Sequence, residues 1–461
     1  MVFSSGVFLY LFLPVFLAAY YALPRRASSL VIAFASYIFY GWWRPDFVGL
    51  MLFSTVVDFF CGRRIVAAQE RGERGKTWLL VSMAVNLGLL GYFKYANFGV
   101  DSFNAIAANF GVGPLDWPKV VLPVGISFYT FQTMSYTIDV YRREATVVDR
   151  FSDFMCYVAL FPQLVAGPIV RYSTVAEQLR HRSHTFAKFY QGVLCFQSGF
   201  VRKILIADTL GQVADPAFAT EALPLVDAWT GLLAYTLQIY FDFSGYSDMA
   251  IGLGLMLGFR FPVNFNGPYR STSITDFWRR WHISLSSWLR DYLYVPLGGN
   301  RKGNLRTYVN LMATMLLGGL WHGAAWTFVI WGAYQGIWLA AERAFGKRAF
   351  WFALPQPLQI LATFVVAMFG WVPFRASSLD GCLTYLGSLF GGSPEGPLLE
   401  ILPLHVGVLA IGMLVAWLPF TTQRLASRAP LTWVVVLQPL FLVALLQLQY
   451  QDHVPFLYYQ F

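Results

Sequence analysis

The chain has 461 residues, of which 57% are hydrophobic and 12% are charged. Soluble domains carry roughly 25% charged residues, so this composition excludes a soluble protein that hides its apolar surface in a core. The 33 Lys and Arg residues outnumber the 24 Asp and Glu residues, a bias that in membrane proteins reflects cytoplasmic loops near anionic lipid rather than nucleic-acid binding. Apolar stretches recur from residue 7 to residue 450 without a long polar block, which predicts a single all-α transmembrane domain over residues 1–461.

The N-terminal part of the chain alternates apolar runs with short loops of contrasting charge. Runs of this length are expected to cross the membrane as helices. Because basic residues cluster after the first, third and fifth runs, the positive-inside rule predicts that these loops are cytoplasmic and that the N-terminus is extracytoplasmic. The first run lacks a basic flank before it and a small-residue site after it, so no cleavable signal peptide is expected. The runs lie near residues 7–23, 29–43, 47–61, 77–95 and 119–141, and the basic loops contain Arg25 and Arg26, residues 63–76, and Arg142 and Arg143.

The middle of the chain is expected to depart from regular spans. Residues 154–170 are apolar but contain Pro162, Gly167 and Pro168, so the sequence leaves open both a broken or re-entrant segment and a clean span. Its basic flank, residues 171–184, is predicted to be cytoplasmic. Two spans follow, near residues 186–206 and 229–258, and we interpret Gly252 and Gly254 in the second as helix-packing positions.

Residues 261–305 alternate between polar and aromatic character, which predicts a cytoplasmic segment with helices in the membrane interface. The next apolar stretch, residues 307–342, has basic residues at both ends and is expected to form a helical hairpin. With the final runs, the chain is expected to contain about 11–13 membrane segments and to end in an extracytoplasmic aromatic tail, residues 451–461. The final runs lie near residues 357–374, 405–420 and 431–450.

His322 lies in the stretch GGLWHGA (318–324), with apolar sequence on both sides. An ionisable side chain at membrane depth is costly, and its default interpretation is functional. An imidazole in this position can stay neutral and act as a general base toward a hydroxyl group. The alternative is a structural histidine that is bonded to a neighbouring helix.

His282 lies where tryptophans and arginines interleave with apolar residues, in TDFWRRWHISLSSWLR (275–290). This composition suits an interfacial helix, with aromatic rings at headgroup depth and arginines at lipid phosphates. Arg279, Arg280 and Arg290 could instead bind the phosphates of a phosphorylated or nucleotide-bearing donor. Both interpretations remain open at this stage, and lipid anchoring is the commoner of the two.

Asp242 and Asp248 place two carboxylates in an apolar context with no obvious cationic partner in the sequence. They either break the helix and line a cavity, or fix helix packing through hydrogen bonds. The chain has no Gly-x-Ser-x-Gly elbow, no Walker loop, and no His-Glu-x-x-His or other His/Cys ligand spacing. Serine-hydrolase, ATPase and metal-dependent mechanisms are therefore disfavoured, and no metal site is predicted.

Four motifs in the second half are specific in combination: WRRWHISL (278–285), RDYLY (290–294), LGGNR (297–301) and GLWHGA (319–324). They are accompanied by MVFSS (1–5), GYFKYANF (91–98), FDFSGYSD (241–248) and PFLYYQF (455–461). Together these motifs resemble the membrane-bound O-acyltransferase (MBOAT) family over nearly the whole chain. Within the family, the likeness is greatest to the membrane subunit of bacterial alginate O-acetylation.

The resemblance implies a ring of helices around a central funnel, with His322 at the position of the family's catalytic histidine and His282 at its second one. It implies a cytoplasmic acyl donor, expected to be acetyl-CoA, near Arg279, Arg280 and Arg290. The acetyl group would cross the membrane to periplasmic O-acetyltransferase or acetyl-relay proteins that modify an exported polysaccharide, alginate in the first instance. The expected location is the bacterial inner membrane, with both termini extracytoplasmic, no permanently bound cofactor and no nucleic-acid partner.

The C-terminal tail is too aromatic to be well solvated and is expected to bury itself. An extended segment covers roughly 3.3 Å per residue, so about ten residues could reach mid-bilayer from outside. Phe456, Tyr458 and Phe461 match the Phe-x-Tyr-x-x-Phe pattern that carries the acyl group outward in related acyl-transfer systems. By that likeness Tyr458 is an acyl relay activated by His322, whereas the alternative is a tail that plugs the funnel or docks a partner.

Two other functions remain open. A transporter or flippase of a glycan or lipid intermediate would use the same intramembrane polar residues as a pathway, although no internal repeat between the halves supports it. An acyltransferase of this type could also handle another acyl group, such as D-alanine. The alginate-like motifs favour acetyl.

Overall fold

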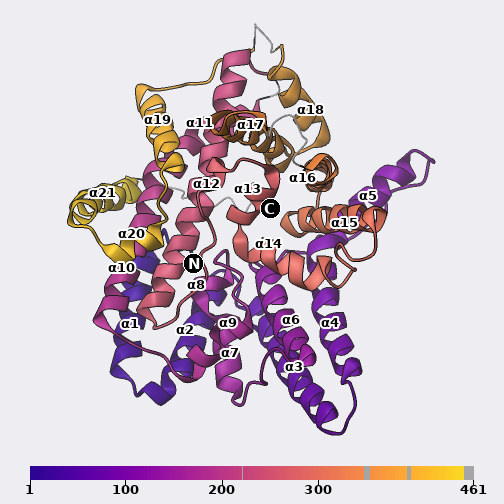
Figure 1. Cartoon of the computed structure of the whole chain (residues 1–461), viewed down its shortest axis with the longest axis vertical. Helices are drawn as coiled ribbons and strands as arrows, with labels where there is room; N and C mark the ends of the chain where they lie inside the picture. Colours follow the sequence, from indigo (N-terminus) through magenta and orange to yellow (C-terminus); the bar gives the residue numbers. More distant parts are fainter. Residues whose placement is uncertain (221, 347–352, 392–395, 451–461) are drawn as a thin grey trace. The chain divides into compact units, whose positions relative to one another are not determined.

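A computed structural model describes residues 1–220, 222–346, 353–391 and 396–450. Every regular element in these ranges is a helix, which confirms the predicted all-α fold (Figure 1). Close contacts divide the chain into two compact units. Unit 1 comprises Met1–Tyr190 and Leu253–Phe261, and unit 2 comprises Gln191–Gly252 and the chain from Pro262 onward.

Unit 1 is organised around α6, in which every residue from Ile126 to Val140 is buried. This helix packs against α3, α4, α7 and α9, and Figure 1 shows α3, α4 and α6 side by side. A π-helical segment, Val7–Phe12, leads into α1. The α-helices are α1 (Leu13–Ala22), α2 (Ser28–Gly41), α3 (Asp46–Glu70), α4 (Lys76–Leu90), α5 (Ala96–Ala108), α6 (Ile126–Arg142), α7 (Phe151–Ala159), α8 (Phe161–Leu164) and α9 (Tyr172–Arg180).

Polar side chains join α3, α4 and α6 inside this unit. The buried carboxylate of Asp58 accepts hydrogen bonds from Ser82 Oγ at 2.6 Å and from Asn86 Nδ2 at 2.8 and 2.9 Å. Thr133 Oγ1 donates to Asn86 Oδ1 at 3.1 Å. Because a buried polar group without a partner is costly, sliding one helix against another would break this set of bonds. The network therefore fixes the register of the three helices.

The helix boundaries differ from the predicted runs in two places. α3 continues to Glu70, through basic residues that favour helix. α6 begins at Ile126 rather than near residue 119, because Pro123 has no amide hydrogen to donate and Gly125 adopts φ of 78°. A Cβ on Gly125 would lie 2.6 Å from the carbonyl oxygen of Leu164, so only glycine fits at this position.

Of the two alternatives for the apolar segment 154–170, the structure shows the broken one. The chain leaves the helical conformation at Leu160, where ψ is 101°, and the short α8 is followed by irregular backbone. The hydroxyl of the buried Tyr157 lies 3.0 Å from the carbonyl oxygen of Gln132 and 3.1 Å from that of Val170. Side chains thus replace the backbone hydrogen bonds that a continuous helix would have supplied.

Unit 2 contains the predicted hairpin, in which α15 and α16 cross at closely packed glycines (Figure 1). A Cβ on Gly319 would lie 2.2 Å from the carbonyl oxygen of Phe328, and one on Gly332 would lie 2.5 Å from that of Met315. The helices that carry the unit are α10 (Phe186–Val201), α11 (Thr209–Ala219), α12 (Leu225–Met256), α13 (Ile274–Arg280), α14 (Ile283–Leu289), α15 (Asn304–His322), α16 (Trp326–Phe345), α17 (Gln356–Arg375), α18 (Leu379–Ser388), α19 (Pro403–Trp417), α20 (Thr422–Arg428) and α21 (Leu431–Tyr450).

Glycines also bring α10 and α12 into direct backbone contact. A Cβ on Gly199 would lie 2.3 Å from the carbonyl oxygen of Gly245, and one on Gly252 would lie 2.5 Å from that of Gly192. This confirms the interpretation of Gly252 as a helix-packing position. α10 does not stop near residue 206, because a π-helical segment, Arg202–Asp208, carries it on into α11.

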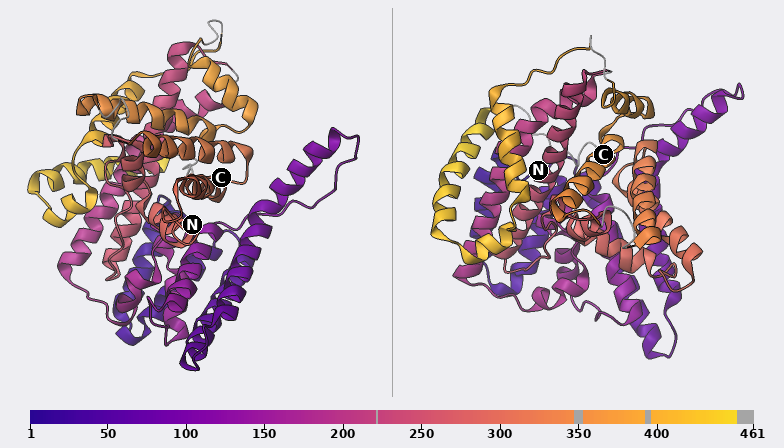
Figure 2. Two further views of the ribbon diagram at one scale, coloured as in Figure 1. Left: turned by 45° about the vertical axis from the view of Figure 1, so that its right-hand side comes forward. Right: turned by 45° about the horizontal axis from the view of Figure 1, so that its top comes forward.

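Three described helices are long and apolar enough to cross a membrane by themselves: Lys76–Ala108, Gln356–Arg375 and Leu431–Tyr450. α19 and α20 would add a fourth as one span bent by 75°. Figure 2 shows the first of these, α4 continued by α5, as a long rod whose far end leaves the other helices of unit 1. The total number of membrane segments stays a prediction.

Candidate functional site

Unit 2 contains a cavity of about 810 Å3, enclosed by α13, α14, the π-helical turn Arg290–Tyr294, α15 and α16. This volume lies within the range of about 300–1,000 Å3 that is usual for small-molecule sites. The cavity therefore joins the predicted cytoplasmic segment to the hairpin that carries His322. The lining residues able to do chemistry or recognise charge are Ser273, Trp278, Arg279, Arg290, Tyr294, His322, Glu342 and Arg343.

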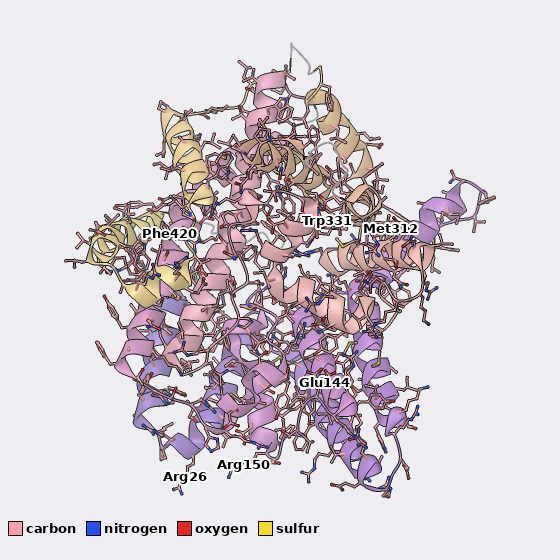
Figure 3. All side chains as sticks on the ribbon, viewed as in Figure 1. Arg26, Glu144, Arg150, Met312, Trp331 and Phe420 are labelled. Atoms are coloured by element: carbon pink, nitrogen blue, oxygen red, sulfur yellow. The ribbon has the colours of Figure 1, made fainter. Side chains whose placement is uncertain are left out.

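His322 is the last residue of α15 and forms part of the cavity wall. Its side chain is nearly buried, with 6% exposed. The imidazole ring packs at steep angles against Trp321, Trp331 and Phe374, with centroid distances of 5.1, 5.1 and 5.2 Å, and Trp331 is labelled in Figure 3. Aromatic packing thus holds the ring in one orientation at the boundary between the cavity and the protein interior.

His282 lies between α13 and α14, fully buried and with a left-handed backbone at φ of 42°. Its Nδ1 lies 3.2 Å from Asn264 Oδ1, which also accepts from the backbone N–H of Ser284 at 3.1 Å and from Ser284 Oγ at 2.9 Å. A backbone N–H can only donate, so the bond from Ser284 identifies the amide oxygen of Asn264. His282 Nδ1 must therefore carry a proton and donate it to that oxygen.

The protonation of His282 follows from its burial, which lowers the pKa of the imidazole to about 3. The ring is neutral, its Nδ1 is protonated, and its Nε2 carries the lone pair. Nε2 is buried and has no hydrogen-bond partner in the described part of the chain. The rings of His282 and His322 lie 6.4 Å apart between centroids. The structure thus brings the two predicted histidines together, with only His322 in the wall of the cavity.

The three predicted donor-binding arginines have different surroundings. Arg279 and Arg290 line the cavity, and Arg290 Nε also lies 2.7 Å from Asp291 Oδ1. Arg280 does not line the cavity. Its Nε instead donates to both carboxylate oxygens of Asp276, one turn earlier in α13, at 3.0 Å. Within the described ranges, Arg279 has no ion-pair partner, which leaves its guanidinium available to an anion.

Arg343 was not selected from the sequence as a site residue, yet it lines the same cavity. Like Arg279, it makes no ion pair with any described residue. The sequence marked it only as part of the basic flank at the end of the hairpin. Its position near Arg279 depends on how α16 packs against α13, and no local sequence signal reports that packing.

Glu342 is a second residue that sequence reasoning missed. Its carboxylate accepts hydrogen bonds from the backbone N–H groups of Ile274 at 2.5 Å and Thr275 at 2.8 Å. These are the first residues of α13, and Ser273 Oγ caps the same helix by accepting from the N–H of Asp276 at 3.1 Å. Glu342 thus fixes the helix that carries Arg279 to the end of α16.

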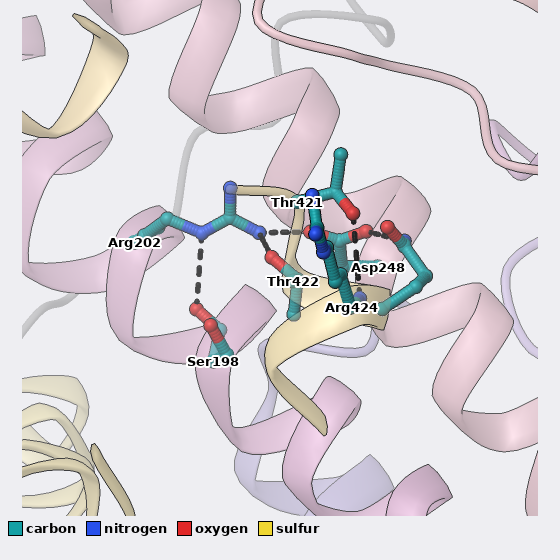
Figure 4. Close-up of polar contacts among 7 residues, drawn as sticks. Ser198, Arg202, Asp248, Thr421, Thr422 and Arg424 are labelled. Atoms are coloured by element: carbon teal, nitrogen blue, oxygen red, sulfur yellow. Dashed lines mark hydrogen bonds and ion pairs between the residues drawn. The ribbon is translucent and has the colours of Figure 1, made fainter. Parts of the chain in front are cut away.

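The carboxylates of Asp242 and Asp248 have cationic partners after all, supplied by the π-helical segment after α10. The ammonium of Lys203 pairs with Asp242 at 2.7 Å and also with Asp208. Arg202 pairs with Asp248, and Figure 4 shows this guanidinium between Asp248, the hydroxyl of Thr422 and the carbonyl of Ser198. Asp248 also accepts from Gln423.

These pairs support the packing alternative for the two carboxylates, because they tie the π-helical segment Arg202–Asp208 to α12 and α20. Neither Asp242 nor Asp248 is among the residues that line the cavity. Tyr458, the proposed acyl relay, lies outside the described residues. Within the described residues, no cluster of three or more His, Cys, Asp or Glu side chains could hold a metal ion.

Comparison with known proteins places these features in context. Residues 119–378 match the model of the membrane-bound O-acyltransferase family. A probable alginate O-acetylase of Azotobacter vinelandii is 55% identical over 85% of this chain and 78% of its own length. One of Pseudomonas putida is 48% identical over the whole of both chains. A peptidoglycan O-acetyltransferase of Helicobacter pylori is 36% identical over 85% of this chain and 80% of its own length.

Proposed function

Because this chain belongs to the membrane-bound O-acyltransferase family, we propose that it moves an acetyl group from cytoplasmic acetyl-CoA across the inner membrane for O-acetylation of an exported polysaccharide. The chain is an O-acyltransferase and a multi-pass membrane protein. Alginate is the first candidate polymer, because the relatives described above as alginate O-acetylases match most of the chain. Peptidoglycan is the polymer named for the more distant relative.

One observation carries the proposal: His322 shares a cavity with Arg279 and Arg343, which form no ion pair with other described residues. A coenzyme A thioester has phosphates at one end and a reactive carbonyl at the other. Guanidinium groups bind phosphates through charge-assisted, often bidentate hydrogen bonds. A donor whose phosphates meet these arginines can extend its thioester toward the imidazole within the same cavity.

The chemistry assigned to His322 is general base catalysis. A neutral ring nitrogen removes the proton from an acceptor hydroxyl as that oxygen attacks the thioester carbonyl carbon. The carbon–sulfur bond then breaks, and the departing thiolate of coenzyme A recovers the proton from the imidazolium. In this proposal His282 does not touch the substrate. Its role is structural: the hydrogen bonds from His282 and Ser284 to Asn264 fix the start of α14, which forms part of the cavity wall.

The acceptor hydroxyl in the proposal is the phenol of Tyr458, which would carry the acetyl group to periplasmic O-acetyltransferase or relay proteins. An unperturbed tyrosine has a pKa of about 10, so it needs a base to become a nucleophile. Tyr458→Phe keeps the aromatic packing and removes only the hydroxyl. Loss of glycan acetylation at normal protein level supports the relay, and wild-type acetylation in this variant rules it out.

The function itself is tested by adding acetyl-labelled coenzyme A to the purified protein in nanodiscs. We expect release of free coenzyme A and appearance of label on the protein or on an added periplasmic partner. A transporter or flippase would leave the thioester intact. A D-alanine-transferring enzyme would be inactive with acetyl-CoA and active with a D-alanyl thioester, and that result would contradict the proposed donor.

A further inference from the structure

A second cavity, of about 530 Å3, lies in unit 1 and shares no lining residue with the first. It is enclosed by the loop after α1, the start of α7 and the segment that follows α9. These are loops that the charge pattern predicts to be cytoplasmic. Figure 3 shows Arg26 and Arg150 at the same end of unit 1. The lining residues are Arg25, Arg26, Ser28, Ser29, Asp149, Arg150, Asp153, Leu179, Arg180, His181, Arg182 and His184.

The lining is strongly basic, with five arginines against two aspartates. One ion pair reduces this excess: Arg180 Nη2 lies 2.7 Å from Asp149 Oδ2. In the described part of the chain, Arg25, Arg26 and Arg150 make no ion pair. Gathering like charges around a cavity is unfavourable unless an anion occupies it or water screens it.

Two buried nitrogens in the lining have no hydrogen-bond partner among the described residues. Arg182 is held by a bond from Nη2 to Ser29 Oγ at 2.5 Å and by the ring of Phe259 at 5.0 Å, which leaves Nη1 buried and unbonded. His184 Nε2 lies 2.9 Å from the hydroxyl of Tyr20, which leaves its Nδ1 buried and unbonded. A site with fixed side chains and unused polar atoms is built for a ligand that supplies the missing partners.

Positive charges also surround His184 at the edge of this cavity. Burial lowers the pKa of this imidazole, and the nearby charges of Arg182, Arg25 and Lys188 lower it further. A cation at this place is therefore disfavoured. An anion that approached Arg182 and Arg25 would be stabilised by the same charges.

We propose that this cavity is a binding site for a phosphate group, held by Arg25, Arg150 and Arg182. Arginine is the residue best suited to bind phosphate oxygens in pairs. The volume exceeds that of a single phosphate, so the ligand is a phosphate-bearing lipid headgroup or a soluble diphosphate. The lipid source has support in the chain itself, because Leu23, Leu30 and Phe186 flank the lining residues in sequence and are 47%, 54% and 85% exposed. Basic pockets on this side of membrane proteins bind anionic headgroups such as cardiolipin.

The proposal is tested with the full chain in phosphatidylcholine nanodiscs. One arm adds cardiolipin and measures its retention by native mass spectrometry, and the other adds inorganic pyrophosphate and measures binding by calorimetry. The test variant is Arg25→Gln with Arg150→Gln, two side chains that make no ion pair with other described residues. The control is Arg74→Gln with Lys76→Gln, which removes two exposed charges where the loop after α3 meets the start of α4, in a stretch also predicted to be cytoplasmic. Size-exclusion chromatography checks that both variants are folded.

We expect the test variant to bind one of the two probes roughly tenfold more weakly than wild type, while the control binds like wild type. Loss confined to cardiolipin assigns the site to a lipid headgroup, and loss confined to pyrophosphate assigns it to a soluble ligand. Unchanged binding of both probes, or an equal loss in the control, overturns the proposal. Binding of neither probe by the wild-type protein overturns it as well. None of these outcomes depends on acetyl transfer.

Discussion

The side-chain oxygen of Asn264 lies 3.2 Å from Nδ1 of His282 and accepts two further hydrogen bonds from Ser284. One amide oxygen therefore sets the tautomer of a buried histidine and the start of α14 together. The sequence separation is 18 residues for the pair Asn264 and His282. Substitutions of Asn264 that keep or remove this oxygen can therefore test whether the hydrogen bonds hold the site together.

Asn264→Leu should destabilise the protein by about 1–3 kcal/mol, because it leaves the donors of His282 and Ser284 buried without an acceptor. Asn264→Asp keeps a carboxylate oxygen in the same place and should lose less stability. Thermal unfolding in detergent and acetyl-transfer rates measure both effects. Equal stability of Asn264→Leu and wild type would show that these hydrogen bonds do not hold the site.

His322→Ala should lower acetyl transfer by roughly 10²–10⁴-fold, the contribution typical of a general base. The matched control is His405→Gln in α19, since His405 is also buried, with 4% exposed, but lies outside the cavity lining and bonds Gln212 at 3.2 Å. Both variants should insert normally. Near-normal transfer by His322→Ala would remove this residue from the mechanism.

Arg279→Gln combined with Arg343→Gln should weaken donor binding by roughly tenfold or more, because each guanidinium can make charge-assisted bonds to phosphate. Arg280→Gln is the control on the same helix, since Arg280 is already paired with Asp276 and lies outside the cavity. Affinity for coenzyme A, measured by calorimetry, distinguishes the two. Equal affinities would identify Arg279 and Arg343 as lipid anchors.

Glu342→Ala should raise the Michaelis constant for the donor and lower stability by about 0.5–2 kcal/mol, the range found for lost helix caps. The two N–H groups at the start of α13 lose their acceptor, so the position of Arg279 is no longer fixed. Glu342→Gln retains one amide oxygen and should be intermediate. An unchanged Michaelis constant in Glu342→Ala would mean that the cap does not position the donor site.

The buried neutral state of His282 predicts a pH effect with a definite sign. Its pKa is about 3 in the folded protein and about 6.5 in an unfolded chain, so between these values the unfolded state binds more protons. The melting temperature should therefore fall as the pH decreases from about 6.5 toward 3. In His282→Gln this part of the decrease should disappear. If the melting temperatures of wild type and His282→Gln fall equally over this pH range, His282 is not held neutral by burial.

The helical part of the fold was largely predictable, because apolar runs and charged loops report the membrane environment directly. The errors occurred where a single backbone feature decides the structure. Pro123 and Gly125 delay the start of α6, and the π-helical segment Arg202–Asp208 extends α10. Neither effect changes the hydrophobic pattern, so neither could be read from it.

The candidate site was predictable only where a residue is unusual in its local sequence. His322 stood out because ionisable groups are rare in apolar sequence, and Arg279 stood out because arginines and tryptophans interleave around it. Glu342 and Asn264 did not, since their importance comes from partners 68 and 18 residues away. Lys203 likewise meets Asp242 only because α10 and α12 touch through glycines. Tertiary contacts, rather than composition, define these roles.

The glycine crossing in the hairpin has a mechanical consequence for His322. α15 and α16 touch at Gly319 and Gly332. Gly319 lies one turn before His322 in α15. Gly332 follows Trp331, one of the aromatic residues that pack against the imidazole ring. Because backbone meets backbone at this point, neither position has room for a side chain larger than hydrogen. A methyl group at either glycine would push the two helices apart beside the imidazole, so the position of His322 depends on two residues that lie outside the cavity lining.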